Sequence, residues 1–172
     1  DGNSGDGINL ALGMGGLLDS GNDHNGDWVV TSVLHNSDGT LTKCLHTMLD
    51  RPKPGCIAVN QQGRRFCNEA AATMAADMQA AGAVPAYLIC DHAFVKKYGL
   101  GLIRPGGFGL KKYLDAGYLL SAATLSELAG QIAVPAEALE ATVLRFNNFA
   151  AAGKDMDFGK GDSAEDRALG DV

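Results

Sequence analysis

Two short runs near the start of the chain are rich enough in Asp and Asn to suggest calcium binding. They are DGNSGDG, which opens the chain, and the later DHNGD. The calcium loop of an EF-hand needs Gly at its sixth position and Glu at its twelfth. The first run has Asp6 and Leu12 at these places, and the second has Trp28 and Leu34. Neither run therefore matches an EF-hand loop.

Cysteine and histidine are the other residue types that could bind a metal ion. The four cysteines are Cys44, Cys56, Cys67 and Cys90. No C-x-x-C pair occurs, and the cysteines do not combine with His at zinc-finger spacing. His24, His35 and His46 are evenly spaced, but Gly, Asn and Asp between them interrupt any helix that would align them. We expect no metal site, and we expect reduced cysteines that serve as small apolar residues, which favours a cytoplasmic location.

The common phosphate-binding and nucleophile motifs are missing from the sequence. There is no G-x-G-x-x-G after a strand and no G-x-x-x-x-G-K-[ST]. The stretch GGFG at residues 106–109 has no helix signal after it, so it is predicted to be a turn. No Ser lies in a G-x-S-x-G context, which excludes a nucleophile elbow.

Composition narrows the classes of function. The chain has 172 residues, of which 46% are hydrophobic and 20% charged, with a net charge of −6. These values are typical of one globular domain. The negative charge argues against a nucleic-acid partner, and no apolar run approaches the ~20 residues that a membrane span needs. The chain starts at Asp1 within a motif-like run, so we expect it to be part of a longer protein.

The first half of the chain should contain a helix, two strands and an Ala-rich helix. The first helix should run from Ile8 toward Leu18, with Ser4 or Asp6 as its cap and its glycines allowing close packing. Residues 19–27 are predicted to form a polar loop. The predicted elements that follow are a short strand over 28–34, a strand over 56–60 with a turn and a return over 64–66, and a helix over 68–81 capped by Asn68.

The second half should be mostly helical. After a strand over 86–90, Asp91 should open a helix over 92–98, and residues 99–117 should form an ordered loop. Thr124 and Glu127 form a capping box for a helix to about Ile132. The longest helix should run from Pro135 to Gly153 and carry an apolar stripe of Leu139, Val143, Phe146 and Ala150. The tail from residue 154 has no periodicity. The fold class is α+β, a small sheet with packed helices.

Four segments, in order, resemble a known family. They are SGDGI (4–8), PGCIAVNQQGRRFCNE (54–69), DHAF with YGLG (91–101), and FGKG with DR (158–167), supported by GYL (117–119) and RFN (145–147). In order and spacing they resemble the FAD-dependent succinate dehydrogenase/fumarate reductase flavoproteins. The closer branch is that of the 3-ketosteroid Δ1-dehydrogenase-like oxidoreductases.

The resemblance implies the capping domain of a two-domain flavoprotein. Residues 1–27 would be the end of a FAD-binding segment, 28–160 the substrate-binding capping domain, and 161–172 a return toward the FAD-binding domain. The cofactor would be FAD, which we expect to be absent from this chain alone because the dinucleotide fingerprint is missing. The partners would be a small-molecule substrate and the missing FAD-binding domain of the same protein. On its own, the chain should be inactive.

Site residues follow from the same resemblance. Gly5 and Asp6 match the family's Gly-Asp-Gly contact to FAD, and capping of the first helix is the alternative role of Asp6. Fumarate reductases place a proton-delivering Arg, and ketosteroid dehydrogenases a Tyr, near the position that Thr73 occupies. A Thr hydroxyl is too weak an acid or base for that role. We expect Thr73 to orient a substrate oxygen unless it only fills space.

The remaining substrate-binding candidates indicate an apolar substrate. Met74 should add an apolar wall beside Thr73. Thr47, Met48 and Arg51 stand where fumarate reductases have a Thr-Glu pair and an Arg, so the dicarboxylate-binding pattern is incomplete. The resemblance therefore implies hydride transfer between flavin and an apolar or enone-type, steroid-like substrate. A fumarate/succinate-type cap and a non-catalytic ligand-binding module remain the alternatives, and no catalytic residue is identified.

Overall fold

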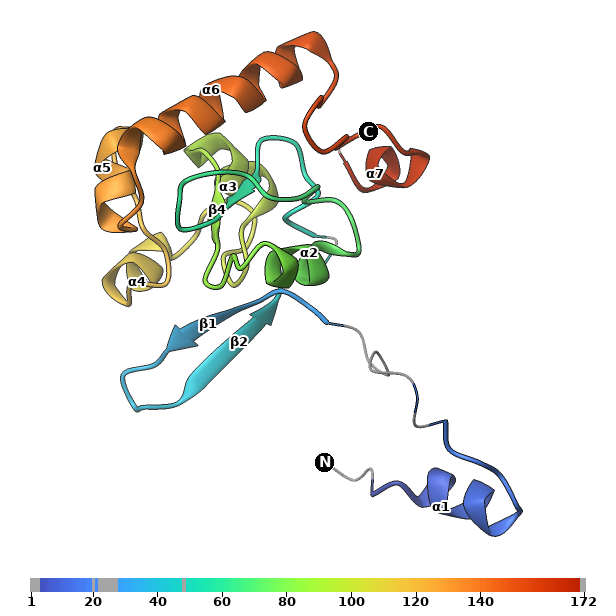
Figure 1. The fold of residues 1–172 in the computed structure, drawn as a ribbon. Coiled ribbons are helices and arrows are strands. Elements are labelled where there is room, and N and C mark those ends of the chain that lie inside the picture. The colour runs from blue at the N-terminus through green and yellow to red at the C-terminus, as the bar shows by residue number, and fades with distance from the viewer. Residues whose placement is uncertain (1–3, 20, 22–27, 48, 171–172) are drawn as a thin grey trace.

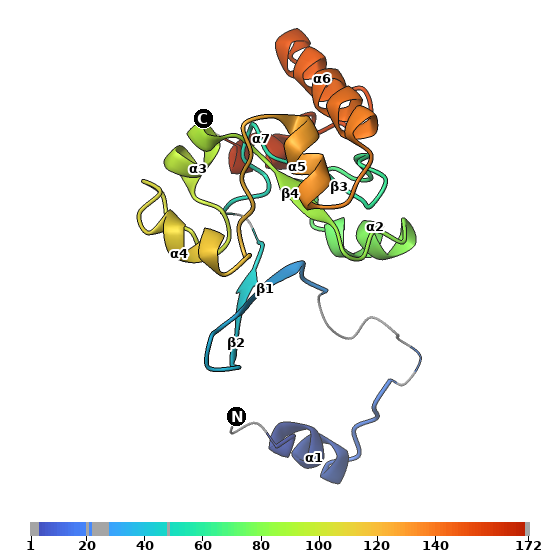
Figure 2. The ribbon, with the colours of Figure 1, turned by 90° about the vertical axis from the view of Figure 1, so that its left-hand side faces the viewer.

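The chain forms seven helices and four short strands among the residues that the computed structural model describes, which are 4–19, 21, 28–47 and 49–170. Figures 1 and 2 show a body of helices around a small sheet, a β-hairpin below it, and one helix apart from both. The elements are α1 (Asp6–Gly13), β1 (Thr31–His35), β2 (Leu41–Leu45), β3 (Ile57–Val59), α2 (Met74–Ala80), β4 (Tyr87–Ile89), α3 (His92–Tyr98), α4 (Leu110–Asp115), α5 (Leu125–Gln131), α6 (Ala136–Ala152) and α7 (Ala164–Leu169).

The strands form two separate antiparallel pairs. β3 and β4 pair with Ile57 opposite Ile89, which confirms the strands predicted over 56–60 and 86–90. β1 pairs with β2, and Ser32 lies opposite Cys44. The sequence reasoning missed β2, although Asp38-Gly39 between the two strands is a strong hairpin signal and Gly39 has φ +81°. The predicted mixture of helices with a small sheet is confirmed, but the single predicted sheet is corrected to two.

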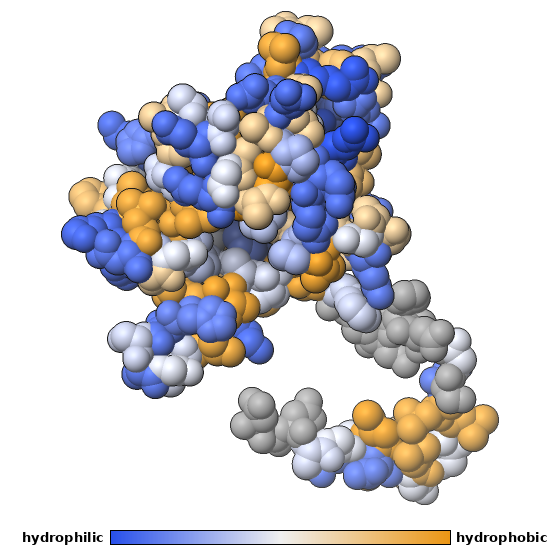
Figure 3. All heavy atoms as spheres, turned by 60° about the vertical axis from the view of Figure 1, so that its left-hand side comes forward, coloured by the Kyte–Doolittle hydropathy of each residue, from blue (hydrophilic) through white to orange (hydrophobic). Residues whose placement is uncertain are grey.

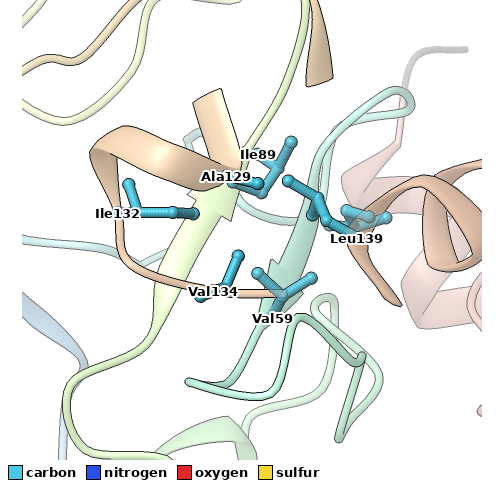
Figure 4. Packing of buried hydrophobic residues seen from close by; sticks show 7 residues of the cluster. Val59, Ile89, Ala129, Ile132, Val134 and Leu139 are labelled. Atoms are coloured by element: carbon cyan, nitrogen blue, oxygen red, sulfur yellow. The ribbon is translucent and has the colours of Figure 1, made fainter. Parts of the chain in front are cut away.

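The main core lies between the β3–β4 pair and the two helices α5 and α6 (Figure 4). Its buried members are Ile57, Val59, Ile89, Ala129, Ile132, Val134 and Leu139. The predicted stripe of α6 faces this core only in part. Leu139 is 0% exposed, Val143 and Phe146 are partly buried against the cluster, and Ala150 is exposed. The first half of α6 therefore carries most of its packing.

Three helix ends are where the sequence places them. The side chain of Asp91 accepts the N–H of Phe94 at 2.7 Å and opens α3. The Thr124 hydroxyl accepts the N–H of Glu127 at 3.2 Å and opens α5. Gly153, with φ +73°, ends α6 in the left-handed conformation. These ends depend on contacts within one turn, which explains why local sequence predicts them.

Several predicted elements differ from the structure. The helix predicted over 68–81 is limited to α2, which begins at Met74. The loop predicted over 99–117 contains α4, which begins right after Gly109, so a helix does follow the GGFG stretch. The tail contains α7, where the Ser163 hydroxyl accepts the N–H of Asp166 at 2.9 Å. Of these three short helices only α7 has a side-chain cap, and none is long enough to show a clear apolar stripe.

Helix α1 is not packed against any described part of the chain. It ends at Gly13 rather than near Leu18, none of its residues is buried, and Figures 1 and 2 show it apart from the body. Gly5 is its N-cap, and no side chain caps it, which corrects the expected cap by Ser4 or Asp6. A Cβ at Gly13 or Gly15 would meet nothing within 4 Å, so no close packing is present there.

Two sequence-based expectations lie wholly or largely outside the described residues. They are the polar loop predicted over 19–27, of which only residues 19 and 21 are described, and the even His spacing that includes His24. Among the helices that are described, none combines the length and apolar character needed to cross a membrane.

Candidate functional site

The predicted cofactor contacts lie at the exposed start of α1. Gly5 has φ +80°, and a Cβ placed on it would meet nothing within 4 Å. Asp6 is exposed, and its carboxylate accepts the Ser4 hydroxyl at 2.9 Å. Both residues are therefore open to a ligand from outside the body. The structure does not bring them together with the predicted substrate contacts.

Arg51 is 5% exposed, and its guanidinium is bound by backbone carbonyls. Its Nε donates to the carbonyl oxygen of His46 at 3.0 Å. Its Nη1 donates to the carbonyl oxygens of Glu69 and Ala71, the latter at 2.7 Å. Burial lowers the pKa of Arg51. Arg51 thus fixes the loop that leads into α2.

Thr73 and Met74 occupy opposite environments at the start of α2. Thr73 is exposed and its hydroxyl donates to the carboxylate of Asp77 at 2.9 Å. Met74 is 1% exposed and packs with Ala58 and Cys67. Arg51 is connected to this segment through Ala71, so the structure brings Arg51 and Thr73 into one region. Met48 lies outside the described residues.

Glu69 lies at the centre of a cluster of buried charges, which we call the ion cluster: Arg65, Glu69, Asp155 and Lys160. The Glu69 side chain is 0% exposed. Its Oε1 accepts Nε of Arg65 at 2.8 Å and the N–H of Ala58 at 3.0 Å. Its Oε2 lies 2.8 Å from Arg65 Nη2 and 3.4 Å from Lys160 Nζ. Glu69 therefore connects β3 with the segment after α6.

The other half of the ion cluster fastens the C-terminal part of the chain. Arg65 Nη2 donates to Asp155 at 2.9 Å, and the rings of Phe146 and Phe158 lie 4.9 and 5.1 Å from its guanidinium carbon. Burial opposes the charge of Arg65, but the two carboxylates outweigh it and raise its pKa. Burial likewise opposes ionisation of Asp155, but hydrogen bonds and charge from Arg65 lower its pKa. The ion cluster holds the segment after α6 against β3, and in this sense we call it a structural clasp.

A second buried polar group was missed by the sequence reasoning. His46 is 5% exposed, and its two ring nitrogens lie 2.6 Å from Asp50 Oδ2 and 2.8 Å from Ser32 Oγ. Ser32 Oγ is also 2.6 Å from the hydroxyl of Tyr118. Along the sequence, the four-residue spacing of His46 and Asp50 was the only local sign of this group. Ser32 and Tyr118 are 86 residues apart, so no local pattern could pair them.

The described cysteines and acidic residues show no metal centre. Within residues 4–19, 21, 28–47 and 49–170, no three His, Cys, Asp or Glu side chains are placed to hold a metal ion. The four cysteines are unpaired, with Cys56 and Cys67 buried and Cys44 and Cys90 half-buried. Burial raises the pKa of Cys67 and that of Cys90 to about 12. These thiols behave as small apolar groups.

Comparison with known proteins places the chain in a family. The model of the family described as "FAD binding domain" matches residues 1–169. The chain belongs to this FAD binding domain family. The resemblance seen in the sequence is thereby confirmed, including its 3-ketosteroid Δ1-dehydrogenase-like branch.

Individual proteins are similar to this chain over almost its whole length. A 3-oxosteroid 1-dehydrogenase of Mycobacterium tuberculosis is 36% identical over 98% of this chain and 31% of its own length. A 4-oxocyclohexanecarboxylate 2-dehydrogenase of Sinomonas cyclohexanicum is 35% identical over 99% of this chain and 30% of its own length. The crystal structure of 3-ketosteroid Δ1-dehydrogenase from Sterolibacterium denitrificans, in complex with 1,4-androstadiene-3,17-dione, matches with a TM-score of 0.72 and 33% identity, covering 99% of this chain and 31% of that one. The chain thus spans about a third of the length of these relatives.

Proposed function

We infer that the protein containing this chain is a FAD-dependent oxidoreductase that transfers hydride between flavin and a cyclic ketone or enone. One observation carries this proposal: the chain matches a 3-oxosteroid 1-dehydrogenase and an oxocyclohexanecarboxylate dehydrogenase over at least 98% of its length. The names of both relatives describe a ring ketone. A steroid-like or smaller apolar ring ketone is therefore the proposed substrate class.

Within that enzyme, residues 28–160 are proposed to form the substrate (capping) domain. Residues 1–27 and 161–172 would connect it to the FAD-binding domain. Exposed apolar side chains on α1 and on the hairpin support such a docked arrangement, and Figure 3 shows apolar surface on both. They include Ile8, Leu10, Leu12, Val33, Leu41 and Leu45. Apolar surface of this extent is typical of a face that another domain covers.

The residues at the start of α1 fit one edge of a FAD site. Gly5 leaves open space for a ligand to approach the backbone, and Asp6 offers an exposed carboxylate to a hydroxyl or N–H donor. Asp6 would repel a pyrophosphate, so a ribityl hydroxyl is its proposed partner. FAD, when bound, supplies the two-electron redox chemistry, and the protein supplies binding and orientation.

Thr73 is proposed to orient a substrate oxygen, with Arg51 and Met74 supporting it. The Thr73 hydroxyl is at the surface, where a substrate oxygen can replace Asp77 as its acceptor. Arg51 holds the loop before α2 by hydrogen bonds to backbone carbonyls of that loop. The buried Met74 side chain packs the start of α2 against the core. These two residues would therefore act by positioning rather than by direct contact.

The test uses the complete protein with FAD bound. A 3-oxosteroid and 4-oxocyclohexanecarboxylate are mixed with it separately, and loss of flavin absorbance is followed. We expect at least one of the two ring ketones to reduce the flavin. We expect fumarate not to reoxidise the reduced flavin. Thr73→Val should lower kcat/KM about tenfold, the effect of one lost hydrogen bond, whereas Thr31→Val on the hairpin should leave it unchanged. Turnover of fumarate but of neither ketone would overturn the proposal.

A further inference from the structure

A cavity lies along the second half of α6, where the apolar stripe of this helix continues beyond the main core. Phe146, Phe149 and Ala150 line it, and its volume is about 450 Å³. Pockets that bind small organic molecules typically have volumes of about 300–1,000 Å³. We call this space the α6 cavity. The part of α6 that carries little core packing is therefore the part that borders an open space.

Two other segments complete the walls of the α6 cavity. One is the loop over residues 52–55, which precedes β3, and the other is α7 with the turn before it, which contributes Arg167. The chain turns back after α6, so that α7 lies below the end of α6 in Figure 1. Lys53 Nζ donates to the carbonyl oxygen of Gly170 at 3.0 Å and joins the loop to the end of α7. Segments far apart in the sequence thus enclose one space.

The lining of the α6 cavity suits an apolar ring system. The rings of Phe146 and Phe149 come from α6, and those of Pro52 and Pro54 come from the loop before β3. Aromatic rings pack well against flat hydrocarbon faces. A Cβ placed on Gly153, which also lines the cavity, would meet nothing within 4 Å. The end of α6 therefore leaves room for a ligand to enter.

Two cations of the lining have free hydrogen-bond donors. Lys154 is exposed just after α6, and its Nζ has no bonding partner among the described residues. Arg167 donates from Nη1 to the carbonyl oxygens of Gly161 at 3.1 Å and Asp162 at 2.6 Å. Its Nε and Nη2 bond to nothing in the part of the chain that the structure describes. A carboxylate could accept from both side chains.

The other charged groups of the lining are already engaged. Asp155 accepts the Arg65 guanidinium through both carboxylate oxygens, within the ion cluster. Asp166 accepts the side-chain amide of Asn68 at 2.8 Å and a backbone N–H at 3.0 Å. Lys160 donates to backbone carbonyls and also belongs to the ion cluster. The lining thus has three cations and two engaged carboxylates, so its free donors favour an anionic ligand.

We propose that the α6 cavity is a second ligand site, which binds an apolar ring compound that carries a carboxylate. The ring system packs between the phenylalanines of α6 and the prolines of the loop before β3, and the carboxylate accepts from Lys154 and Arg167. The lining includes neither Asp6 nor Thr73, so this site is separate from the proposed cofactor and substrate contacts. The inference therefore goes beyond the proposed function and does not rest on it.

The experiment compares two compounds that differ in charge. The complete FAD-loaded protein is titrated with 2-naphthoate and, separately, with 2-naphthalenemethanol, which has the same rings and no charge. Calorimetry gives the dissociation constants, and the flavin absorbance reports any binding beside the flavin. We expect 2-naphthoate to bind without a change in flavin absorbance, and the alcohol to bind about tenfold more weakly, because it lacks charge-assisted hydrogen bonds. Equal affinities would overturn the proposal.

Ala150→Phe and Ala151→Phe form a matched pair that locates the site. Both alanines are exposed on α6, but only Ala150 lines the cavity. A phenyl ring at position 150 fills the space, so Ala150→Phe should abolish the binding of 2-naphthoate that leaves the flavin absorbance unchanged. Ala151→Phe should leave this binding within about twofold, as is usual for surface substitutions. The same affinity in both variants would overturn the assignment to this cavity.

Lys154→Met tests the charge without filling the cavity. Methionine keeps an unbranched side chain and removes the ammonium group, so the affinity for 2-naphthoate should fall about fivefold while that for the alcohol stays the same. Lys111→Met is the control, because Lys111 is equally exposed on α4 and pairs with Asp115 at 2.8 Å. It should change neither affinity. An equal fall in both variants would mean that net charge, and not this site, attracts the anion, and it would overturn the proposal.

Cysteine labelling decides whether another part of the complete protein covers the cavity. Ala150→Cys and Ala151→Cys are treated with a maleimide, and labelling of the α6 peptide is followed by mass spectrometry. We expect similar rates without ligand, and 2-naphthoate should slow Ala150→Cys alone, by about fivefold or more. If Ala150→Cys is protected without ligand and 2-naphthoate does not bind, a segment of the same protein covers the cavity, and the proposal is overturned. Neither result depends on whether a ring ketone reduces the flavin.

Discussion

The ion cluster is one buried polar group, and the hydrogen-bonded row of Tyr118, Ser32, His46 and Asp50, which we call the His46 network, is another. The two groups are connected differently. In the ion cluster Arg65 bonds to two carboxylates, and Glu69 bonds to two cations and a backbone N–H, so cations and anions balance. In the His46 network, Ser32 and His46 each have one hydrogen-bonding neighbour on either side, and the row ends at the Asp50 carboxylate. A closed set of opposite charges holds each member through several partners, whereas a member inside an open row depends on two contacts. The pattern of partners therefore separates a strongly fastened group from a weakly fastened one.

The largest expected effect is on the ion cluster. Glu69→Gln keeps the shape of the side chain but leaves Arg65 and Lys160 with one buried anion fewer. Breaking a buried ion pair in this way should lower the free energy of unfolding by about 3–5 kcal/mol, measured by urea denaturation. The exposed pair Lys111–Asp115 is the control, because pairs of its kind contribute about 0–1 kcal/mol. If removing either pair lowered the free energy of unfolding by a similar amount, the buried ion cluster would contribute no more than an exposed ion pair, which would contradict this prediction.

A second prediction uses pH to separate Asp155, which is paired with the buried Arg65, from Asp157, which is paired with the exposed Arg145. Because the pKa of folded Asp155 is held below its usual value, its contribution is complete above about pH 4 and is lost as the pH falls through the folded pKa. Asp155→Asn should lower the free energy of unfolding by about 1.5–3 kcal/mol at pH 7 and flatten its decline below about pH 4. Asp157→Asn, whose partner Arg145 is exposed, should change both less. An unchanged acid slope in Asp155→Asn would contradict the clasp.

The smallest effect is expected in the His46 network. Ser32→Ala removes one half-buried hydroxyl and leaves Tyr118 and His46 without their shared partner. The free energy of unfolding should fall by only about 1 kcal/mol, because the residue is partly accessible and water can replace the hydroxyl. Thr31→Ala on the exposed face of the same strand should cost less. A loss as large as that of Glu69→Gln would mean that the His46 network is fastened as strongly as the ion cluster.

Local sequence predicted those parts of the fold that depend on neighbours along the chain. The caps at Asp91 and Thr124 and the end of α6 at Gly153 each involve contacts within one turn. The helix predicted over 68–81 failed for a long-range reason. The carbonyls of Glu69 and Ala71 bind Arg51, which is 18 and 20 residues away in the sequence, and the segment before α2 forms turns there. No local pattern could reveal that contact.

The site was predicted less completely than the fold. Resemblance pointed to Gly5, Asp6 and the Thr73 region, and the structure places these at accessible helix starts. The His46 network was missed because Ser32 is 14 residues from His46 and 86 residues from Tyr118. Ser and Tyr are common, and only the folded chain shows that the hydroxyls of these two residues lie within hydrogen-bonding distance. Contacts between residues that are far apart in the sequence are therefore the main limit on predicting a site from one sequence.

One hydrogen bond of the His46 network crosses between parts of the molecule that are fastened separately. Lys160 Nζ donates to the carbonyls of Arg51 and Cys56, so the clasp encloses residues 57–159 and leaves the hairpin outside this loop. The Ser32–Tyr118 hydrogen bond joins the hairpin to the enclosed part, together with the packing of Val30 and Leu34 against its buried side chains. The contacts of the hairpin are therefore distinct from those of Lys160, so local unfolding of the hairpin would leave the enclosed part fastened.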